Sequence, residues 1–308
     1  MDRIEGQRIL VTGATGQVAG RLTEQLAERN EVHAAARFTD AKAKAALEAK
    51  GIRTAYFSMG EADLSSLPDV DYVIHCGCNT SPKTPEIGIA QNAEGTGFLM
   101  QRYRGARAFF HMSSSSVYRV PASSREATKE SDTLGGYSVY SPHYAMSKLA
   151  TESVVRFQAR VLNLPTIIAR LDVAYGVRGH GGVPMALYEM MKHGASYTRA
   201  AAGESYCSPI HEDDIADQVE RLVLRAAVPA PIVNLGGDEA VSVEEMIRHV
   251  ESLTGLKMKV EVGESASWGM KVLDATRRRE LAGPCRVSWK EGVRRSLAAR
   301  HPGAIVAQ

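Results

Sequence analysis

A glycine-rich segment near the amino terminus, residues 9–20, limits the fold more than any other part of the chain. It begins with three apolar residues, Ile9-Leu10-Val11, which predict a buried parallel strand because no polar residue alternates with them. A glycine turn follows, and apolar residues at helical spacing then continue to about Arg29. A helix that starts after such a turn directs backbone N–H groups at an anion. The segment therefore predicts a nucleotide-binding unit.

The spacing of the turn is Gly13-x-x-Gly16-x-x-Ala19, which differs from the Gly-x-Gly-x-x-Gly fingerprint. An ordinary strand-turn-helix connection remains an alternative. If the turn binds a dinucleotide, its glycines let the pyrophosphate approach the backbone. The expected cofactor contacts in this turn are Gly13, Thr15, Gly16, Gln17 and Val18.

The second predicted strand, residues 31–36, ends at Arg37. In folds of this kind an acidic residue at this place holds the ribose 2′-hydroxyl, whereas an arginine suits a 2′-phosphate. Ala36 stands where the acid would be, so Arg37 favours NADP(H), with NAD(H) still possible. The alternative is that Arg37 is an ordinary solvated charge.

Short apolar runs alternate with helical patterns through the first half of the chain. Strands are expected at 52–57, 72–76, 108–112, 166–169 and 232–235, and helices at 40–50, 86–103 and 144–163. This alternation predicts an α/β protein with a Rossmann-type, doubly wound parallel sheet. Ligands of such sheets gather at the carboxyl ends of the strands, where Cys76, Gly77 and a run of four serines, Ser113–Ser116, follow two of them.

The character of the chain changes after Gly176, where aromatic residues and methionines become frequent. We therefore expect a Rossmann domain at 1–176, to which 207–240 returns. A substrate-binding subdomain is expected at 177–206 and 241–308. For most of these apolar residues, packing in an ordinary core is the favoured alternative. The residues expected to contact substrate are Ser115, Tyr140, Val177, Met185 and Tyr206.

Tyr144 and Lys148 are four residues apart in a predicted helix, which puts both side chains on one face. An ammonium near a phenol lowers the pKa of the phenol from about 10. Such a tyrosine exchanges a proton near neutral pH, as alcohol–carbonyl interconversion requires. The spacing alone is weak evidence, and it gains weight from the nucleotide-binding turn in the same chain.

The composition sets further limits. The 308 residues include 37 basic and 35 acidic side chains, for a net charge of +2, and no long basic run indicates nucleic acid. The short run Arg277-Arg278-Arg279 is expected to be a solvated helix face. No apolar run is long enough to cross a membrane, and residues 1–7 lack the apolar centre of a signal peptide. Of the four cysteines, Cys76 and Cys78 would end a buried strand and are expected to be buried thiols rather than a metal pair or a disulfide. A cytoplasmic protein with no metal site is expected.

Taken together, eight segments resemble the extended short-chain dehydrogenase/reductase family, which includes the NAD-dependent epimerase/dehydratase group. The segments follow the family's order from residue 8 to about residue 300: Val11–Gly16, Asp71–His75, Asn92–Thr96, Ser113–Tyr118, Tyr144-x-x-x-Lys148, Arg170–Gly176, His211–Ala216 and Val233–Gly236. The resemblance is specific for fold and cofactor class and weak for substrate.

The resemblance implies roles for individual residues. Tyr144 would be the general acid/base, and Lys148 would lower its pKa and hold the nicotinamide ribose. Ser114 would bind the substrate oxygen, because it lies four places before Tyr118. Val173 would also contact the cofactor. A homodimer formed by the helices at 86–103 and 144–162 is the family's arrangement.

Two departures from the family pattern bear on the reaction. Members that dehydrate nucleotide sugars carry an Asp-Glu pair where this chain has Ser115 and Ser116. Epimerases often carry an arginine shortly before the segment that begins at His211, and this chain has none there, although Arg178 or Arg199 could replace it.

The favoured hypothesis is therefore an NAD(P)-dependent oxidoreductase that reduces a carbonyl or oxidises a secondary alcohol of a small molecule, with a Ser114-Tyr144-Lys148 site. An NAD-dependent nucleotide-sugar epimerase is the first alternative, and a nucleotide-sensing protein without turnover is the second.

Overall fold

The computed structural model describes residues 3–119, 121, 123–135, 141–264, 268 and 270–306. Its centre is a seven-stranded sheet in the order β11-β6-β5-β4-β1-β2-β3, in which every neighbouring pair is parallel. The strands are β1 (Arg8–Thr12), β2 (Glu31–Ala36), β3 (Arg53–Tyr56), β4 (Tyr72–His75), β5 (Ala108–Ser114), β6 (Thr166–Leu171) and β11 (Ile232–Leu235). The predicted α/β class with a parallel sheet is confirmed.

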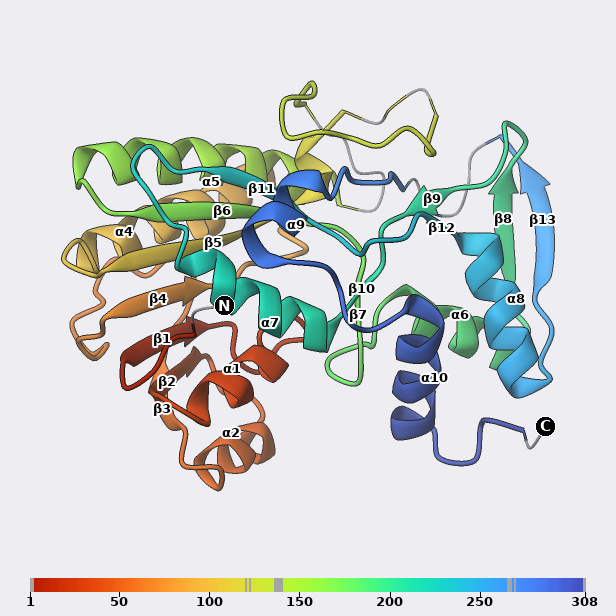
Figure 1. Cartoon of the computed structure of the whole chain (residues 1–308), viewed down its shortest axis with the longest axis horizontal. Helices are drawn as coiled ribbons and strands as arrows, with labels where there is room; N and C mark the ends of the chain where they lie inside the picture. Colours follow the sequence, from red (N-terminus) through yellow and green to blue (C-terminus); the bar gives the residue numbers. More distant parts are fainter. Residues whose placement is uncertain are drawn as a thin grey trace.

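Helices cover both faces of this sheet (Figure 1). On one face pack α1 (Gly20–Ala27), α2 (Ala41–Glu48) and α7 (Glu212–Val223). On the other pack α4 (Gly95–Arg102) and α5 (Pro142–Val161). The order of the strands reverses between β1 and β4, so a crevice for a ligand is expected at the carboxyl ends of these two strands.

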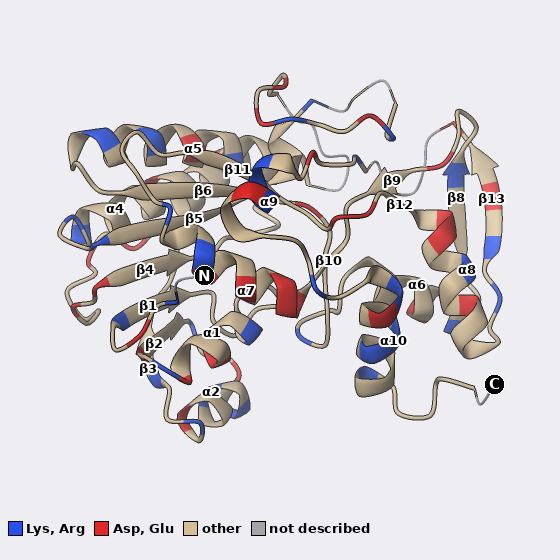
Figure 2. Ribbon diagram, viewed as in Figure 1, with Lys and Arg blue, Asp and Glu red and all other residues tan. Residues whose placement is uncertain are grey.

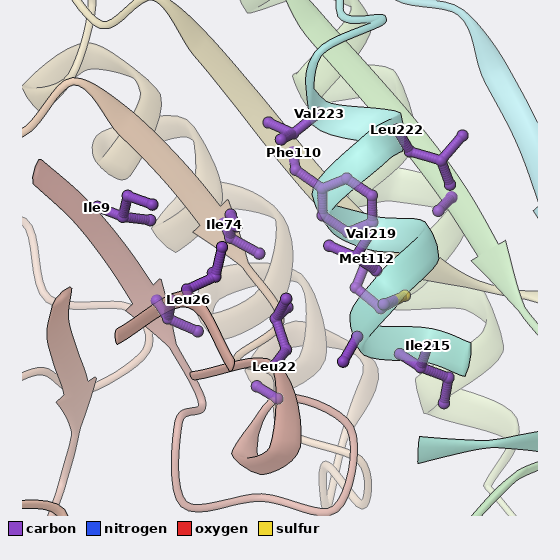
Figure 3. Close-up of a cluster of buried hydrophobic side chains, with 14 of the residues drawn as sticks. Ile9, Leu22, Leu26, Ile74, Phe110, Met112, Ile215, Val219, Leu222 and Val223 are labelled. Carbon is purple, nitrogen blue, oxygen red and sulfur yellow. The ribbon is translucent and has the colours of Figure 1, made fainter. Parts of the chain in front are cut away.

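The sheet is buried on both faces, which explains why β1 is apolar without alternation. Ile9 and Val11 belong to the core on the α1 and α7 side, whereas Leu10 belongs to the core on the α4 and α5 side. Figure 3 shows the first of these cores, where side chains of α1 and α7 meet those of β1, β4 and β5. The labelled residues are Ile9, Leu22, Leu26, Ile74, Phe110, Met112, Ile215, Val219, Leu222 and Val223.

The helix expected at 86–103 is present but is not uniform. It consists of α3 (Pro85–Gly88), a π-helical segment η1 (Ile89–Glu94) and α4. A Cβ added to Gly95 would lie 2.6 Å from the backbone nitrogen of Gly60, so the helix contacts that loop closely. A wider turn of this kind often occurs at functional sites, and Asn92 within it belongs to the network described below.

The second half of the chain forms a separate apolar core, on the right in Figure 1. Its helices are α6 (Val183–Lys192), α8 (Val243–Thr254) and α10 (Trp289–Arg300). Three small sheets accompany them: β8 (Ser196–Ala200) with β13 (Lys259–Gly263), β9 (Tyr206–Cys207) with β12 (Val241–Ser242), and β7 (Ala174–Tyr175) with β10 (Ile210–His211). Most of the aromatic residues and methionines noted after Gly176 pack in this core, which agrees with the alternative that they are ordinary core residues.

Two cores support the proposed division into a Rossmann domain and a second subdomain, with one adjustment. Helix α9 (Thr276–Ala282) lies within the range assigned to the second subdomain, yet Ala282 belongs to the core of the main sheet. We therefore propose that α9 be counted with the Rossmann domain. Helix α8 starts with a capping box, because Ser242 accepts from the Glu245 N–H and Glu245 accepts from the Ser242 N–H.

Charged residues of both signs are interspersed over the chain (Figure 2). No helix in the described ranges has the length and apolar character needed to cross a membrane.

The expectation for Arg277-Arg278-Arg279 is wrong at its middle residue. Arg278 is fully buried and donates to Asp238 and to the Gly283 carbonyl, whereas its two neighbours are exposed. One turn of α9 points this guanidinium inward, where a carboxylate and the carbonyls at the helix end receive it.

We predict that Arg278→Met lowers the free energy of unfolding by about 2–3 kcal/mol, because hydrogen bonds of a buried charged group are lost. Arg277→Met is the matched control and should change it by less than about 0.5 kcal/mol. Urea titration of both variants measures the difference. Equal values would show that the buried contacts of Arg278 contribute nothing to stability.

Candidate active site

The turn between β1 and α1 approaches the segment after β4 very closely. Gly13 has φ +71°, and a Cβ built on it would lie 3.0 Å from both the Cα and the nitrogen of Gly77. Glycine is required at Gly13 for both reasons. Helix α1 begins only at Gly20, later than expected. The backbone N–H groups of Thr15, Gln17 and Val18 therefore have no acceptor among the described residues, and they remain available for an anionic ligand.

A buried hydrogen-bond chain fixes this turn to the sheet. Gly77 N–H donates to Thr12 Oγ1 at 3.0 Å, and Thr12 Oγ1 lies 2.7 Å from His75 Nδ1. His75 Nε2 lies 2.9 Å from Thr96 Oγ1, whose proton goes to the Asn92 carbonyl. Each hydroxyl has one proton, so Thr12 donates to Nδ1, and Nε2 of His75 carries the ring proton. With this neutral tautomer, every donor and acceptor in the hydrogen-bond chain from Gly77 to Asn92 has a partner.

A second histidine, His111, lies beside His75 in the register of β4 and β5, with ring centroids 5.5 Å apart. Burial lowers the pKa of His75 to about 3, and the nearby Lys148 lowers it further. Burial also lowers the pKa of His111 well below its usual value, again with Lys148 and then His75 contributing. Neither ring nitrogen of His111 has a hydrogen-bond partner among the described residues. Both rings are therefore neutral at physiological pH.

This pair makes stability depend on pH. The pKa of such a histidine is lower in the folded state than its value of about 6.5 in the unfolded state. Between these two pKa values the unfolded state binds more protons than the folded state, so the free energy of unfolding falls as pH drops from about 6.5 toward 3. His111→Phe should reduce this loss by up to about 1.4 kcal/mol per pH unit. Urea unfolding at pH 7 and pH 5 measures the slope. Replacing the exposed His193 with Gln is the control, and an unchanged slope in His111→Phe would contradict the prediction.

The three predicted catalytic residues come together at the carboxyl end of β5. Ser114 and the thiol of Cys78 are the side chains that act on the pKa of the Tyr144 hydroxyl, so both lie close to it. Lys148 is buried, lies 5.8 Å from the centroid of the Tyr144 ring, and donates to the Met112 carbonyl at 2.7 Å. The i,i+4 spacing on α5 thus places phenol and ammonium on one face, as the sequence predicted.

The expected lowering of the Tyr144 pKa is not what this arrangement gives. Burial raises the pKa of Tyr144, and the neighbouring Cys78 raises it further, against a smaller lowering by the Ser114 hydrogen bond. The Lys148 ammonium instead donates to the backbone of β5. Tyr144 therefore holds its proton at neutral pH.

Three polar residues missed by the sequence analysis support the start of α5. Asn92 donates to the Ser147 hydroxyl at 2.9 Å and to the Asn79 carbonyl at 2.9 Å. Ser147 in turn donates to the Tyr144 carbonyl at 2.8 Å. Asn92 lies in a segment noted for its family resemblance, and its place in the π-helical turn η1 was not visible in the sequence.

The remaining cofactor residues lie around the same edge of the sheet. Arg37 is exposed directly after β2 and forms no hydrogen bond or ion pair with another described side chain. Cys76 and Val173 follow β4 and β6 and are half-buried. Cys76 is a free thiol whose pKa burial raises to about 12.

The predicted substrate residues do not form one group. The Ser115 hydroxyl donates to Asp172, and the Tyr206 hydroxyl donates to Glu204. Val177 has an exposed side chain, and its backbone N–H donates to Glu212. Met185 is 1% exposed and packs in the second core, so the structure places it away from any open surface. Tyr140 lies outside the described residues.

Arg178 is not free to replace a missing diphosphate-binding arginine. Its guanidinium pairs with Glu24 at 2.7 Å and with Glu212 at 3.1 Å, so it joins α1 to α7. Its aliphatic part packs on Gly20, where a Cβ would lie 2.5 Å from Arg178 Cδ. A cavity of about 970 Å³ lies elsewhere, between α5, α9 and β11. No group of three potential metal ligands occurs within the described ranges.

The geometry fits a dinucleotide. A glycine turn without a Cβ, unpaired backbone N–H groups and a strand-order reversal coincide where a pyrophosphate would lie. The buried ammonium of Lys148 and the hydroxyls of Tyr144 and Ser114 stand at the other end of the same edge.

These features agree with the sequence comparison. Residues 9–236 match the NAD dependent epimerase/dehydratase family, and the chain belongs to that family. It is an NAD-dependent enzyme of the extended short-chain dehydrogenase/reductase type, with a nicotinamide cofactor.

The chain is similar to a dTDP-4-dehydro-6-deoxy-D-allose reductase of Streptomyces bikiniensis, with 26% identity over 91% of this chain and 92% of that protein. Its fold is similar to that of a UDP-glucuronic acid 4-epimerase from Bacillus cereus, with a TM-score of 0.81 and 20% identity. The match covers 95% of this chain and 98% of that structure. A UDP-glucose 4-epimerase from Thermotoga maritima gives the same TM-score, identity and coverage.

Proposed function

We propose that this protein is a reductase that transfers hydride from a nicotinamide to the carbonyl of a nucleotide-linked sugar, or the reverse. The observation that carries the proposal is the position of Tyr144, whose hydroxyl lies close to Ser114 and whose ring centroid lies 5.8 Å from the Lys148 ammonium on the same helix face. The sugar class rests on similarity to the allose reductase, which covers nearly the whole chain.

The residues have separate tasks in this reaction. When bound, the nicotinamide supplies or accepts the hydride. Ser114 donates to the substrate oxygen as negative charge grows on it, and Tyr144 transfers the proton to that oxygen. Lys148, fixed by the Met112 carbonyl, places a positive charge beside the phenol without needing to move. Because burial raises the pKa of Tyr144, the phenol carries the proton that reduction of a carbonyl requires.

An epimerase on the same scaffold remains the alternative. It would oxidise and re-reduce its sugar on a cofactor that it never releases. The fold is shared with two UDP-sugar epimerases, so the fold does not decide between these reactions. Nucleotide extracted from the purified protein separates them, because tightly retained NAD supports the epimerase and exchangeable NADPH supports the reductase. A sensor without turnover would bind nucleotide and convert none of the sugars.

We predict that Tyr144→Phe lowers kcat by about 100-fold or more, because the proton donor is lost. The dissociation constant for the cofactor should stay within about twofold, since the ring is kept. NAD(P)H oxidation with dTDP-4-dehydro-6-deoxy-D-allose measures the rate, and Tyr56→Phe on the exposed edge of β3 is the control. Near-normal turnover in Tyr144→Phe would remove this residue as the acid/base.

We further propose that Arg37 selects NADP(H), because it is exposed directly after β2 and forms no ion pair with a described residue. Arg37→Ala should weaken NADPH by about tenfold, the size of one charge-assisted contact, and NADH by less than about twofold. Arg104→Ala, another exposed arginine, is the control. Cofactor titration by fluorescence measures both constants, and equal losses for the two cofactors would refute the assignment.

A homodimer through α4 and α5 remains a proposal. It is supported by exposed apolar side chains on these two helices, among them Phe98 at 40%, Phe157 at 63% and Val161 at 60% exposure. Sedimentation equilibrium would give twice the chain mass if this face is paired. The cytoplasmic location likewise remains a prediction.

A further inference from the structure

An unusual pair of opposite charges lies directly beside the serine run. Lys271, in the segment between β13 and α9, is 6% exposed, and its ammonium donates to the Ser115 carbonyl at 3.3 Å. Asp172, at the end of β6, accepts from the Ser115 hydroxyl at 2.9 Å and from the Ser208 N–H at 2.8 Å. Both charges therefore converge on the residue that follows Ser114.

The two groups are near enough to influence each other but do not form a direct ion pair. Burial lowers the pKa of Lys271 and raises the pKa of Asp172, and in each case the opposite charge works against burial. Within the described ranges the hydrogen bonds of these two side chains go to Ser115 and Ser208, and no salt bridge joins Lys271 to Asp172. A buried charge without a close partner is costly, so this arrangement needs a reason.

The lysine has unused hydrogen-bonding capacity. An ammonium carries three N–H donors, and within the described part of the chain only the Ser115 carbonyl receives one from Lys271. The carboxylate of Asp172 has lone pairs beyond the two that Ser115 and Ser208 use. A ligand group that accepts a hydrogen bond from Lys271 and donates one to Asp172 would use the free capacity of both side chains.

A hydroxyl has this combination of donor and acceptor, whereas a carboxylate or phosphate has acceptors alone and would be repelled by Asp172. The pair is neutral overall, which also favours an uncharged ligand. The backbone fixes the position of the pair. The Ser208 hydroxyl accepts from the Leu273 N–H at 3.0 Å, and the Ser208 N–H donates to Asp172. Ser208 thus connects the segment that carries Lys271 to Asp172.

We propose that Asp172 and Lys271 recognise a hydroxyl on the carbon next to the reacting carbonyl, and so determine which sugars are accepted. The inference rests on the proposed function, because Ser114 and Tyr144 define the reacting carbonyl. In a 4-dehydro-6-deoxy sugar this hydroxyl is the one on C3. Lys271 donates to it, it donates to Asp172, and the catalytic serine next in the chain binds the carbonyl oxygen.

The test compares dTDP-4-dehydro-6-deoxy-D-allose with its 3-deoxy analogue, using wild type, Lys271→Met, Lys271→Arg and the exposed control Lys192→Met. Wild type and Lys192→Met should prefer the hydroxyl compound by about 100-fold in kcat/KM, because a site built to bond a hydroxyl rejects the analogue without it. Lys271→Met should lose most of this preference, mainly through KM, and Lys271→Arg should recover part of it. Cofactor affinity should stay unchanged in all four proteins.

An unchanged preference in Lys271→Met would overturn the inference while leaving the reductase proposal intact. If wild type converts neither sugar, the reductase proposal fails, and calorimetric binding of both sugars to the NADP⁺-loaded proteins then tests the pair. Tighter binding of the hydroxyl compound by wild type than by Lys271→Met would support recognition without turnover. Equal binding, or none, would overturn it. Asp172→Asn should reproduce the loss seen in Lys271→Met, and a normal preference in that variant would restrict the role to Lys271.

Discussion

Parallel pairing of the central strands is the constraint on which the site depends. It brings the carboxyl ends of β1, β4, β5 and β6 to one edge, and each strand end contributes a polar group to the candidate site. Thr12 ends β1, His75 ends β4 and Ser114 ends β5, while Asp172 follows β6. The Lys148 ammonium is bonded to a carbonyl of β5, so its position follows the register of that strand. The helices add side chains to an edge that the sheet has already defined.

The polar groups behind this edge explain how it is held rigid. His75 is neutral and bonded at both ring nitrogens, so it connects β1 to the π-helical turn without carrying charge. Glu152 and Arg170 form a buried, two-point ion pair between α5 and β6, and Ser113 donates to the same carboxylate. These contacts fix α5 against the sheet at the turn after Lys148. Preorganisation of this kind is what positions a proton donor for reaction.

Local patterns in the sequence predicted the Rossmann half and the residues that the structure brings together in the candidate site. Apolar runs located the seven sheet strands, and the i,i+4 spacing located Tyr144 and Lys148 on one face. The pairing of β8 with β13 was not predicted, because the two strands lie about sixty residues apart in the chain and neither has a strong pattern of its own. Burial of Arg278 and the raised pKa of Tyr144 were also missed. Both depend on neighbours that only the folded chain supplies, such as Asp238 and Cys78.

Separate cores in the two halves affect how such an enzyme can diverge. The second core closes on itself around α6, α8 and α10, and few of its side chains reach the sheet. Substitutions there can change the residues around that core while the sheet and α5, which carries Tyr144, keep their packing. One half can thus accumulate changes in specificity, and the other can preserve the reaction, so a lineage can acquire new substrates without rebuilding its catalytic apparatus.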